Sequence, residues 1–216
     1  MFDRYETLFD CGSESHPCVD EHNGIVRLRF NAFDVQSEMR RKAPAELVLR
    51  YTRTMVAAIR QEPPPRSIGI IGLGGGSLAK HCYRRYPAAS IGVAEINPEV
   101  IALRNDFCIP EDDHRFTVYC EDGAEFVQRH RNEFDVLLVD GFDRHGQPPQ
   151  LCSAQFYQDC YRSLTARGIL VVNICGNHQL IDKIRLGRWN QVTVEDAGKK
   201  RLNTVVIAGK GVPAAP

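Results

Sequence analysis

Glycines and carboxylates recur between residues 67 and 143, and each group directly follows a short apolar run. The first run ends at the cluster Gly72-Leu73-Gly74-Gly75-Gly76, and the next three end at Glu95, Asp122 and Asp140. Glycines let backbone N–H groups approach a ligand closely, and carboxylates accept hydrogen bonds from hydroxyl and amino groups. Ligands of open parallel sheets bind beyond the carboxyl ends of the strands. The spacing therefore predicts a nucleotide-type cofactor site where four strand ends meet.

The glycine cluster alone is weak support for this site, because Ser77 stands where the strict dinucleotide fingerprint has its last glycine. A tight strand-to-helix turn is the alternative explanation. Glu95 ends the next strand, about 20 residues further on, where an acid characteristically hydrogen-bonds the ribose hydroxyls. The combination of loop and acid favours ribose binding.

The other acids also have structural alternatives. Asp122-Gly123 opens a predicted helix, and Asp is a favourable N-cap, so Asp122 can cap the helix and still present a carboxylate to a ligand. Asp140 and Asp143 follow the fourth run within a segment ending at Gly146, where an Asp-rich turn is the alternative.

The elements that must position these residues alternate after residue 66. Strands are expected at 68–71, 90–94, 116–120, 134–139 and 168–174, with helices at 78–86, 98–107, 123–130, 153–164 and 178–186. Two further β-rich runs, 191–195 and 203–208, close the chain. This order predicts an α/β, doubly wound parallel sheet with helices on both faces and a C-terminal antiparallel hairpin.

The N-terminal part has a different pattern. A strand at 25–30 with a hairpin partner at 32–36 is expected to precede a helix at 45–59, which three prolines end. We therefore expect a small N-terminal β-hairpin and helix region, 1–62, and a nucleoside-binding catalytic domain, 63–216.

Composition narrows the classes of function. The 216 residues include 27 basic and 27 acidic side chains, so the net charge indicates neither nucleic acid nor a membrane as partner. The N-terminus has no signal-peptide pattern, and no apolar run is long enough to span a membrane. The eight cysteines are scattered without metal-ligand spacing, which predicts a reduced, cytoplasmic protein without a metal; a Cys11–Cys18 bridge is the alternative.

At these residues the chain resembles the polyamine aminopropyltransferases, the spermidine synthase family, which has the class I S-adenosylmethionine-dependent methyltransferase fold. The family's I-I-G-G-G-D-G-G loop is similar to residues 70–77, and its E-I-D motif is similar to Glu95-Ile96-Asn97. Its D-G adenine contact and its D-x-x-D-P-x-G catalytic loop resemble Asp122-Gly123 and residues 140–146. Upstream, the V-Q-x segment resembles residues 35–37, and Tyr51 falls where the family has a pocket tyrosine.

This resemblance implies a transferase that moves an aminopropyl group from decarboxylated S-adenosylmethionine to an amine, with Asp140 as the base. Tyr51 and Asp143 would then contact the amine acceptor. The residues expected at the nucleoside co-substrate are Gln36, Gly72, Gly74, Gly75, Gly76, Glu95, Ile96, Asp122 and Gly123. The resemblance also implies a homodimer.

Two positions depart from the family pattern. Gly75 replaces an acid of the family's glycine loop, and Arg53 replaces an acid two places after the pocket tyrosine. Both changes remove negative charge from a site for cations. The alternatives are therefore an S-adenosylmethionine-dependent methyltransferase acting on a small molecule, or a non-catalytic nucleoside-binding relative.

Overall fold

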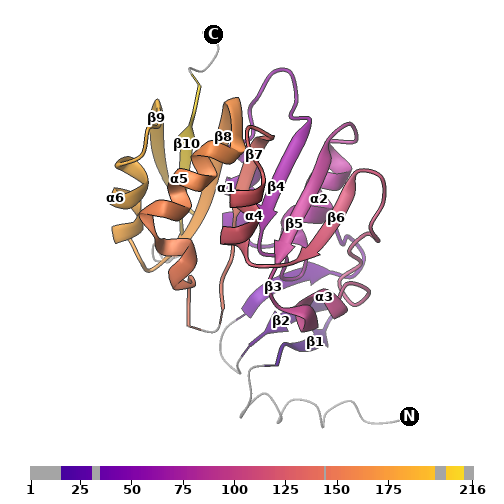
Figure 1. Ribbon diagram of the computed structural model, residues 1–216. Coiled ribbons are helices and arrows are strands. Elements are labelled where there is room, and N and C mark those ends of the chain that lie inside the picture. The colour runs from indigo at the N-terminus through magenta and orange to yellow at the C-terminus, as the bar shows by residue number, and fades with distance from the viewer. Residues whose placement is uncertain (1–15, 31–34, 144, 198–202, 212–216) are drawn as a thin grey trace, which may run out of the picture.

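The structure is a computed structural model that describes residues 16–30, 35–143, 145–197 and 203–211. Its main sheet has the strand order β6-β5-β4-β7-β8-β10-β9 (Figure 1). Those strands are β4 (Ser67–Ile71), β5 (Ser90–Glu95), β6 (Phe116–Cys120), β7 (Phe134–Val139), β8 (Leu164–Cys175), β9 (Gln191–Asp196) and β10 (Asn203–Gly209). Strands β4 to β8 pair in parallel, whereas β10 is antiparallel to both β8 and β9. The predicted α/β class and the C-terminal hairpin are confirmed.

Helices cover both faces of this sheet (Figure 1). The helices are α1 (Arg50–Ala57), α2 (Ser77–Arg85), α3 (Pro98–Ala102), α4 (Gly123–Arg129), α5 (Ala154–Ser163) and α6 (Gln179–Arg185), and Pro149–Cys152 forms a 3-10 turn. Alternate strand residues face opposite layers: Val136 and Leu138 pack with the layer of α1 and α2, while Leu137 and Val139 pack with that of α4 and α5. This alternation builds two cores, one on each face.

Two predicted helices are shorter than expected. Residues 45–49 do not join α1, because Leu49 has extended backbone and Arg53 donates to the Leu47 and Val48 carbonyl oxygens. Helix α3 ends at Ala102, and the chain then turns towards Cys108, whose φ is +52°. In both places side-chain and turn contacts override helical spacing.

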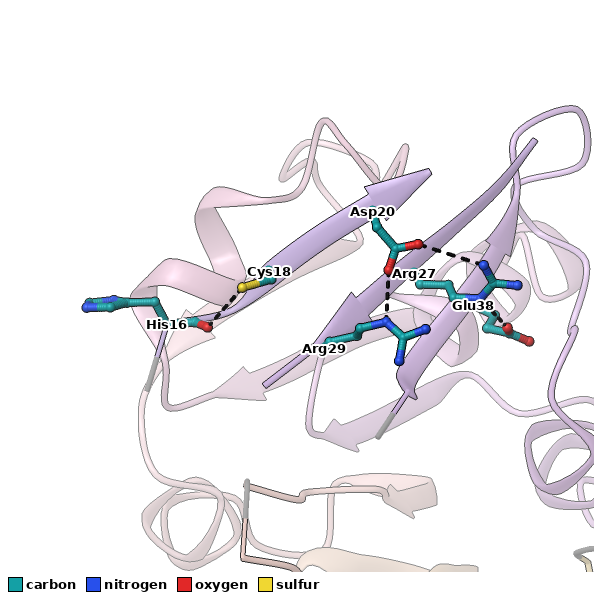
Figure 2. A network of polar contacts seen from close by, with 6 residues as sticks. All are labelled: His16, Cys18, Asp20, Arg27, Arg29 and Glu38. Carbon is teal, nitrogen blue, oxygen red and sulfur yellow. Dashed lines mark hydrogen bonds and ion pairs between the residues drawn. The ribbon is translucent and has the colours of Figure 1, made fainter. Parts of the chain in front are cut away.

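A small antiparallel sheet of β1 (Cys18–His22), β2 (Ile25–Arg29) and β3 (Val35–Arg40) lies beside the carboxyl ends of β4 and β5 (Figure 1). Its polar face carries the ion pairs of Asp20 with Arg29 and of Arg27 with Glu38, each with a nitrogen–oxygen distance of 2.8 Å (Figure 2). The opposite face buries Val26, Leu28 and Met39 in the core. The predicted partner of β2 lies at 35–40 rather than at 32–36, and residues 31–34 lie outside the described part of the chain.

Within the described residues, six cysteines form no disulfide, whereas Cys18 is disulfide-bonded, so the prediction that all cysteines are reduced is wrong at Cys18. The other half of the Cys11–Cys18 alternative lies outside those residues. None of the described helices is long and apolar enough to cross a membrane, and the described side chains include no metal-binding group of three or more His, Cys, Asp or Glu.

Candidate active site

A cavity of about 260 Å³ lies at the carboxyl ends of β4 to β7. The strand order reverses between β4 and β7, and such a reversal leaves a crevice where the connections diverge to opposite faces. The small sheet and α1 form the opposite wall of the cavity. The site that the sequence predicts at these strand ends therefore coincides with a cavity.

The glycine loop approaches β7 closely. Gly72, Gly74 and Gly76 have φ angles of +93°, +50° and +66°, in the region that favours glycine. A Cβ atom on Gly72 would collide with the carbonyl group of Asp140. Glycine at position 72 therefore allows the loop to pass beside the acid that the sequence marks as catalytic.

Glu95 holds the glycine loop in place. Its Oε2 accepts a hydrogen bond from the Leu73 N–H at 2.9 Å, and its Oε1 accepts one from the Asn97 N–H at 2.9 Å. Each carboxylate oxygen keeps a further lone pair, so ribose hydroxyls can still donate to Glu95 from the cavity. Glu95 thus has a structural contact that its predicted ribose role did not include.

The side chain of Ile96 adds an apolar surface beside this acid. It lies on the cavity wall with 58% of its surface exposed, although it is a large aliphatic residue. An exposed isoleucine on a cavity wall suits contact with a flat apolar ring, since covering it removes apolar surface from water.

Asp122 has both of its predicted functions available. Its Oδ1 accepts the Ala124 N–H at 2.7 Å, which caps α4, while its Oδ2 accepts from Nε2 of Gln150 at 3.0 Å on the cavity wall. Gly123 leaves no room for a side chain, because a Cβ there would collide with Ile71. Sequence reasoning missed Gln150, which lies in the 3-10 turn Pro149–Cys152 after β7.

Asp140 is the centre of a partly buried hydrogen-bond network. Its Oδ2 accepts from the Tyr51 hydroxyl at 3.1 Å, and its Oδ1 accepts from Nδ2 of Asn173 at 2.8 Å. Burial raises the pKa of Asp140 from 3.8 to about 7, although both hydrogen bonds favour the ionised form and oppose that rise. Burial and the neighbouring Asp140 carboxylate raise the pKa of Tyr51 well above its usual value. Asp140 is therefore a carboxyl group that can exchange a proton near neutral pH.

Sequence reasoning also missed Asn173 and Asn203. Asn173 is 2% exposed on β8, and its Oδ1 accepts from Nδ2 of Asn203 on β10 at 3.2 Å. The available signal was a polar amide within the otherwise apolar run Ile169–Ile174, since buried polar groups require partners.

A β-bulge brings two consecutive residues of β3 to the cavity. Leu28 pairs with Ser37 and Arg29 pairs with Val35, so Gln36 is the extra residue. Neighbouring side chains of a regular strand point to opposite faces, yet both Gln36 and Ser37 line the cavity. The bulge therefore gives the predicted Gln36 its access.

The two positions that depart from the family pattern are in close contact with neighbouring residues. A Cβ atom on Gly75 would lie 2.7 Å from Oγ of Ser37 and 2.8 Å from the ring of Phe107. Arg53 donates to two carbonyl oxygens of the preceding loop at 2.7 Å each. Neither residue is among those that line the cavity, and Gly76 is not among them either.

Asp143 lies at the outer edge of the cavity. Its side chain is exposed, and its Oδ1 accepts the His145 N–H at 2.6 Å. Its backbone pairs with Gly146 in an isolated β-bridge, which fixes the turn after β7. Apart from Gly75 and Gly76, every predicted site residue lies on the cavity wall.

Comparison with known proteins identifies the family of the chain. Residues 49–186 match the family described as the spermine/spermidine synthase domain. The chain belongs to this family. It is 36% identical over 156 residues to a polyamine aminopropyltransferase of Chromobacterium violaceum, an alignment that covers 72% of this chain. The alignment covers 60% of that relative, so this family member spans about three fifths of its length.

Solved structures share the fold. A spermidine synthase in complex with the transition-state analogue AdoDATO superposes with a TM-score of 0.75 at 20% identity, over 94% of this chain and 73% of that one. Human methyltransferase-like protein 13 in complex with SAH superposes with a TM-score of 0.64 at 21% identity, over 74% and 81% of the two chains. The methyltransferase-like fold is confirmed.

Proposed function

We propose that this family member transfers an aminopropyl group from decarboxylated S-adenosylmethionine to an amine acceptor, with Asp140 as the base. The observation that carries the proposal is the charge of the cavity wall. Among the described lining residues, four are carboxylic acids, Glu95, Asp122, Asp140 and Asp143, and none is Lys, Arg or His. Such a wall favours cations, and both a sulfonium donor and a protonated amine acceptor are cations.

The wall also provides the contacts for an adenosine group. Glu95 would accept from the ribose hydroxyls, Ile96 would cover the base, and Asp122 with Gln150 would contact its edge. Gln36 would reach the nucleoside from the small region, residues 1–62, while the domain of residues 63–216 supplies the glycine loop. The AdoDATO and SAH complexes of proteins with the same fold support an adenosine ligand here.

The charge of the wall supports the decarboxylated donor over intact S-adenosylmethionine. Intact S-adenosylmethionine carries a carboxylate, which would meet a wall of acids without a basic partner among the described residues. The decarboxylated donor lacks that group. Four acids still line the cavity although Gly75 replaces an acid of the family's glycine loop.

The reaction requires an amine with a free lone pair. The amine nitrogen would attack the aminopropyl carbon, the carbon–sulfur bond would break, and methylthioadenosine would leave as a neutral thioether. Asp140 would accept the proton, held in position by Tyr51, while Asp143 would hold a distal ammonium. An ordinary carboxyl lies about 6 pH units below an amine of pKa about 10, whereas a pKa of about 7 halves that gap.

The test is an assay with the purified chain. Decarboxylated S-adenosylmethionine with putrescine, cadaverine or spermidine is expected to release methylthioadenosine and lengthen the amine. Asp140→Asn should abolish this release, and Asp182→Asn, which changes an exposed acid on α6, should not. Production of S-adenosylhomocysteine from the intact donor would instead show methyl transfer, and binding of methylthioadenosine without turnover would show a non-catalytic relative.

A further inference from the structure

We propose that Asn203 is a positioning residue that fixes the amide orientation of Asn173 and thereby keeps a hydrogen-bond donor facing Asp140. The three side chains form a directional chain across β10, β8 and the end of β7. Asn203 donates to Oδ1 of Asn173 at 3.2 Å, and Nδ2 of Asn173 donates to Oδ1 of Asp140 at 2.8 Å. The consequence for catalysis depends on the proposed function, whereas the consequence for the Asp140 carboxyl does not.

This chain of hydrogen bonds depends on the two different ends of the Asn173 side-chain amide, its oxygen and its NH2 group. If the side-chain amide of Asn173 turned over, its NH2 would face the NH2 of Asn203, and its oxygen would face Asp140. The first contact brings two donors together at a side chain that is 2% exposed, where unpaired polar groups are costly. Asn203 therefore disfavours the turned-over orientation.

The orientation of Asn173 determines which form of Asp140 is stabilised. An N–H group facing the carboxyl favours the ionised form, while an amide oxygen facing it favours the protonated form, which can donate. Without Asn203, protonated Asp140 gains a partner at little cost, so its pKa rises. The present hydrogen bond from Asn173 opposes the effect of burial on this group.

Other groups around Asp140 are fixed by different contacts. Tyr51 on α1 donates to the second carboxyl oxygen, and Cys175 on β8 acts electrostatically on Tyr51. Glu95, Asp122 and Asp143 share the cavity wall. None of these side chains makes a hydrogen bond to Asn173 or Asn203 among the described contacts, so a change at Asn203 reaches Asp140 through Asn173.

Two variants separate orientation from charge. In Asn203→Asp the ionised side chain has only hydrogen-bond acceptors. Asn173 must then turn its NH2 towards residue 203 and its oxygen towards Asp140. Asn203→Leu removes the donor without adding charge. The matched control is Asn190→Asp, because Asn190 donates to the Lys210 carbonyl at the far end of β10, about 20 Å from Asn203.

The measurement is the titration of the Asp140 carboxyl by carbon-13 NMR of protein labelled at aspartate, with Asp140→Asn to assign the signal. We expect Asn203→Asp to raise the pKa of Asp140 by about 1 unit or more and Asn203→Leu to raise it by about half a unit. Asn190→Asp should leave it unchanged. If aminopropyl transfer is also found, the acid limb of kcat/KM should shift by the same amounts.

An unchanged titration in folded Asn203→Leu would overturn the proposal, even if Asn203→Asp shifts, because the added charge alone would then explain that shift. If Asn203→Asp does not fold, the leucine variant decides. The titration needs no substrate, so a raised pKa without any aminopropyl transfer would support the positioning role and reject the proposed function. Aminopropyl transfer together with an unchanged pKa of Asp140 would support the proposed function and reject the positioning role of Asn203.

Discussion

Replacing Asp140 by Asn should stabilise the ligand-free protein while abolishing its activity. The carboxyl lies on the cavity wall and is partly buried, and desolvation there raises its pKa from 3.8 to about 7. Asparagine has nearly the same shape and can still accept a hydrogen bond from Asn173 or Tyr51, but it never carries the charge. The variant therefore removes the cost of holding a carboxylate at this position.

The sign and size of the effect follow from the pKa of Asp140. Between pH 3.8 and about 7 the folded chain binds a proton that the unfolded chain has released, so the free energy of unfolding falls as the pH rises. The pKa of Asp140 differs by about 3 units between the folded and unfolded chain, and each unit corresponds to about 1.4 kcal/mol. At pH 8 the ionised carboxylate therefore lowers the free energy of unfolding of the wild type by roughly 4 kcal/mol. About 3 kcal/mol of this fall in the free energy of unfolding occurs between pH 5 and pH 8.

Urea unfolding of the wild type and Asp140→Asn at several pH values tests this expectation. The stability difference should grow by about 3 kcal/mol from pH 5 to pH 8 in favour of the variant. Asp182→Asn, at an exposed site on α6, should show no such growth. A pH-independent difference, or a variant less stable than the wild type at pH 8, would refute the conclusion that Asp140 is held against its ionised form.

Three further changes test the other contacts of the site. Tyr51→Phe removes the hydroxyl that favours the Asp140 carboxylate, so the acid limb of the pH–rate profile should move up by about half a unit to one unit. Glu95→Gln leaves one oxygen for two backbone N–H groups, and should weaken methylthioadenosine binding in calorimetry at least about tenfold. Gly75→Asp should lower stability in urea by about 1–3 kcal/mol, and a second change, Ser37→Gly, should recover part of this loss, because the new side chain would meet Ser37.

Two of these changes, Tyr51→Phe and Glu95→Gln, have a matched control variant. Tyr83→Phe removes a hydroxyl that bonds Asp113 on the surface, and should leave the pH–rate profile in place. Glu99→Gln alters an exposed acid close to Glu95 in sequence, and should not affect methylthioadenosine binding. Equal effects in a variant and its control would show that the contact named for that site does not explain the result. For Gly75, a double variant no more stable than Gly75→Asp alone would exclude the clash with Ser37.

The local sequence predicted the order of elements and most of the cavity wall. The cavity wall could be predicted from the apolar runs that end at Gly72, Glu95, Asp122 and Asp140. Parallel pairing places the carboxyl ends of these strands on one edge of the sheet. Helix ends were less predictable. The segment 45–49 has helical spacing, but side-chain contacts made with its carbonyls hold it outside α1.

Only the tertiary structure determined the contacts between residues that lie far apart in the chain. Tyr51, Asp140, Asn173 and Asn203 come from four separate elements, and no spacing rule relates a helix before β4 to a strand at the chain's end. The pKa of Asp140 is likewise a property of burial rather than of residue type. The bulge at Gln36 depends on how β3 pairs with β2. The sequence by itself thus determined which residues meet at the strand ends, and the fold decided their hydrogen-bond partners and charge states, because these depend on solvent exclusion and on long-range packing.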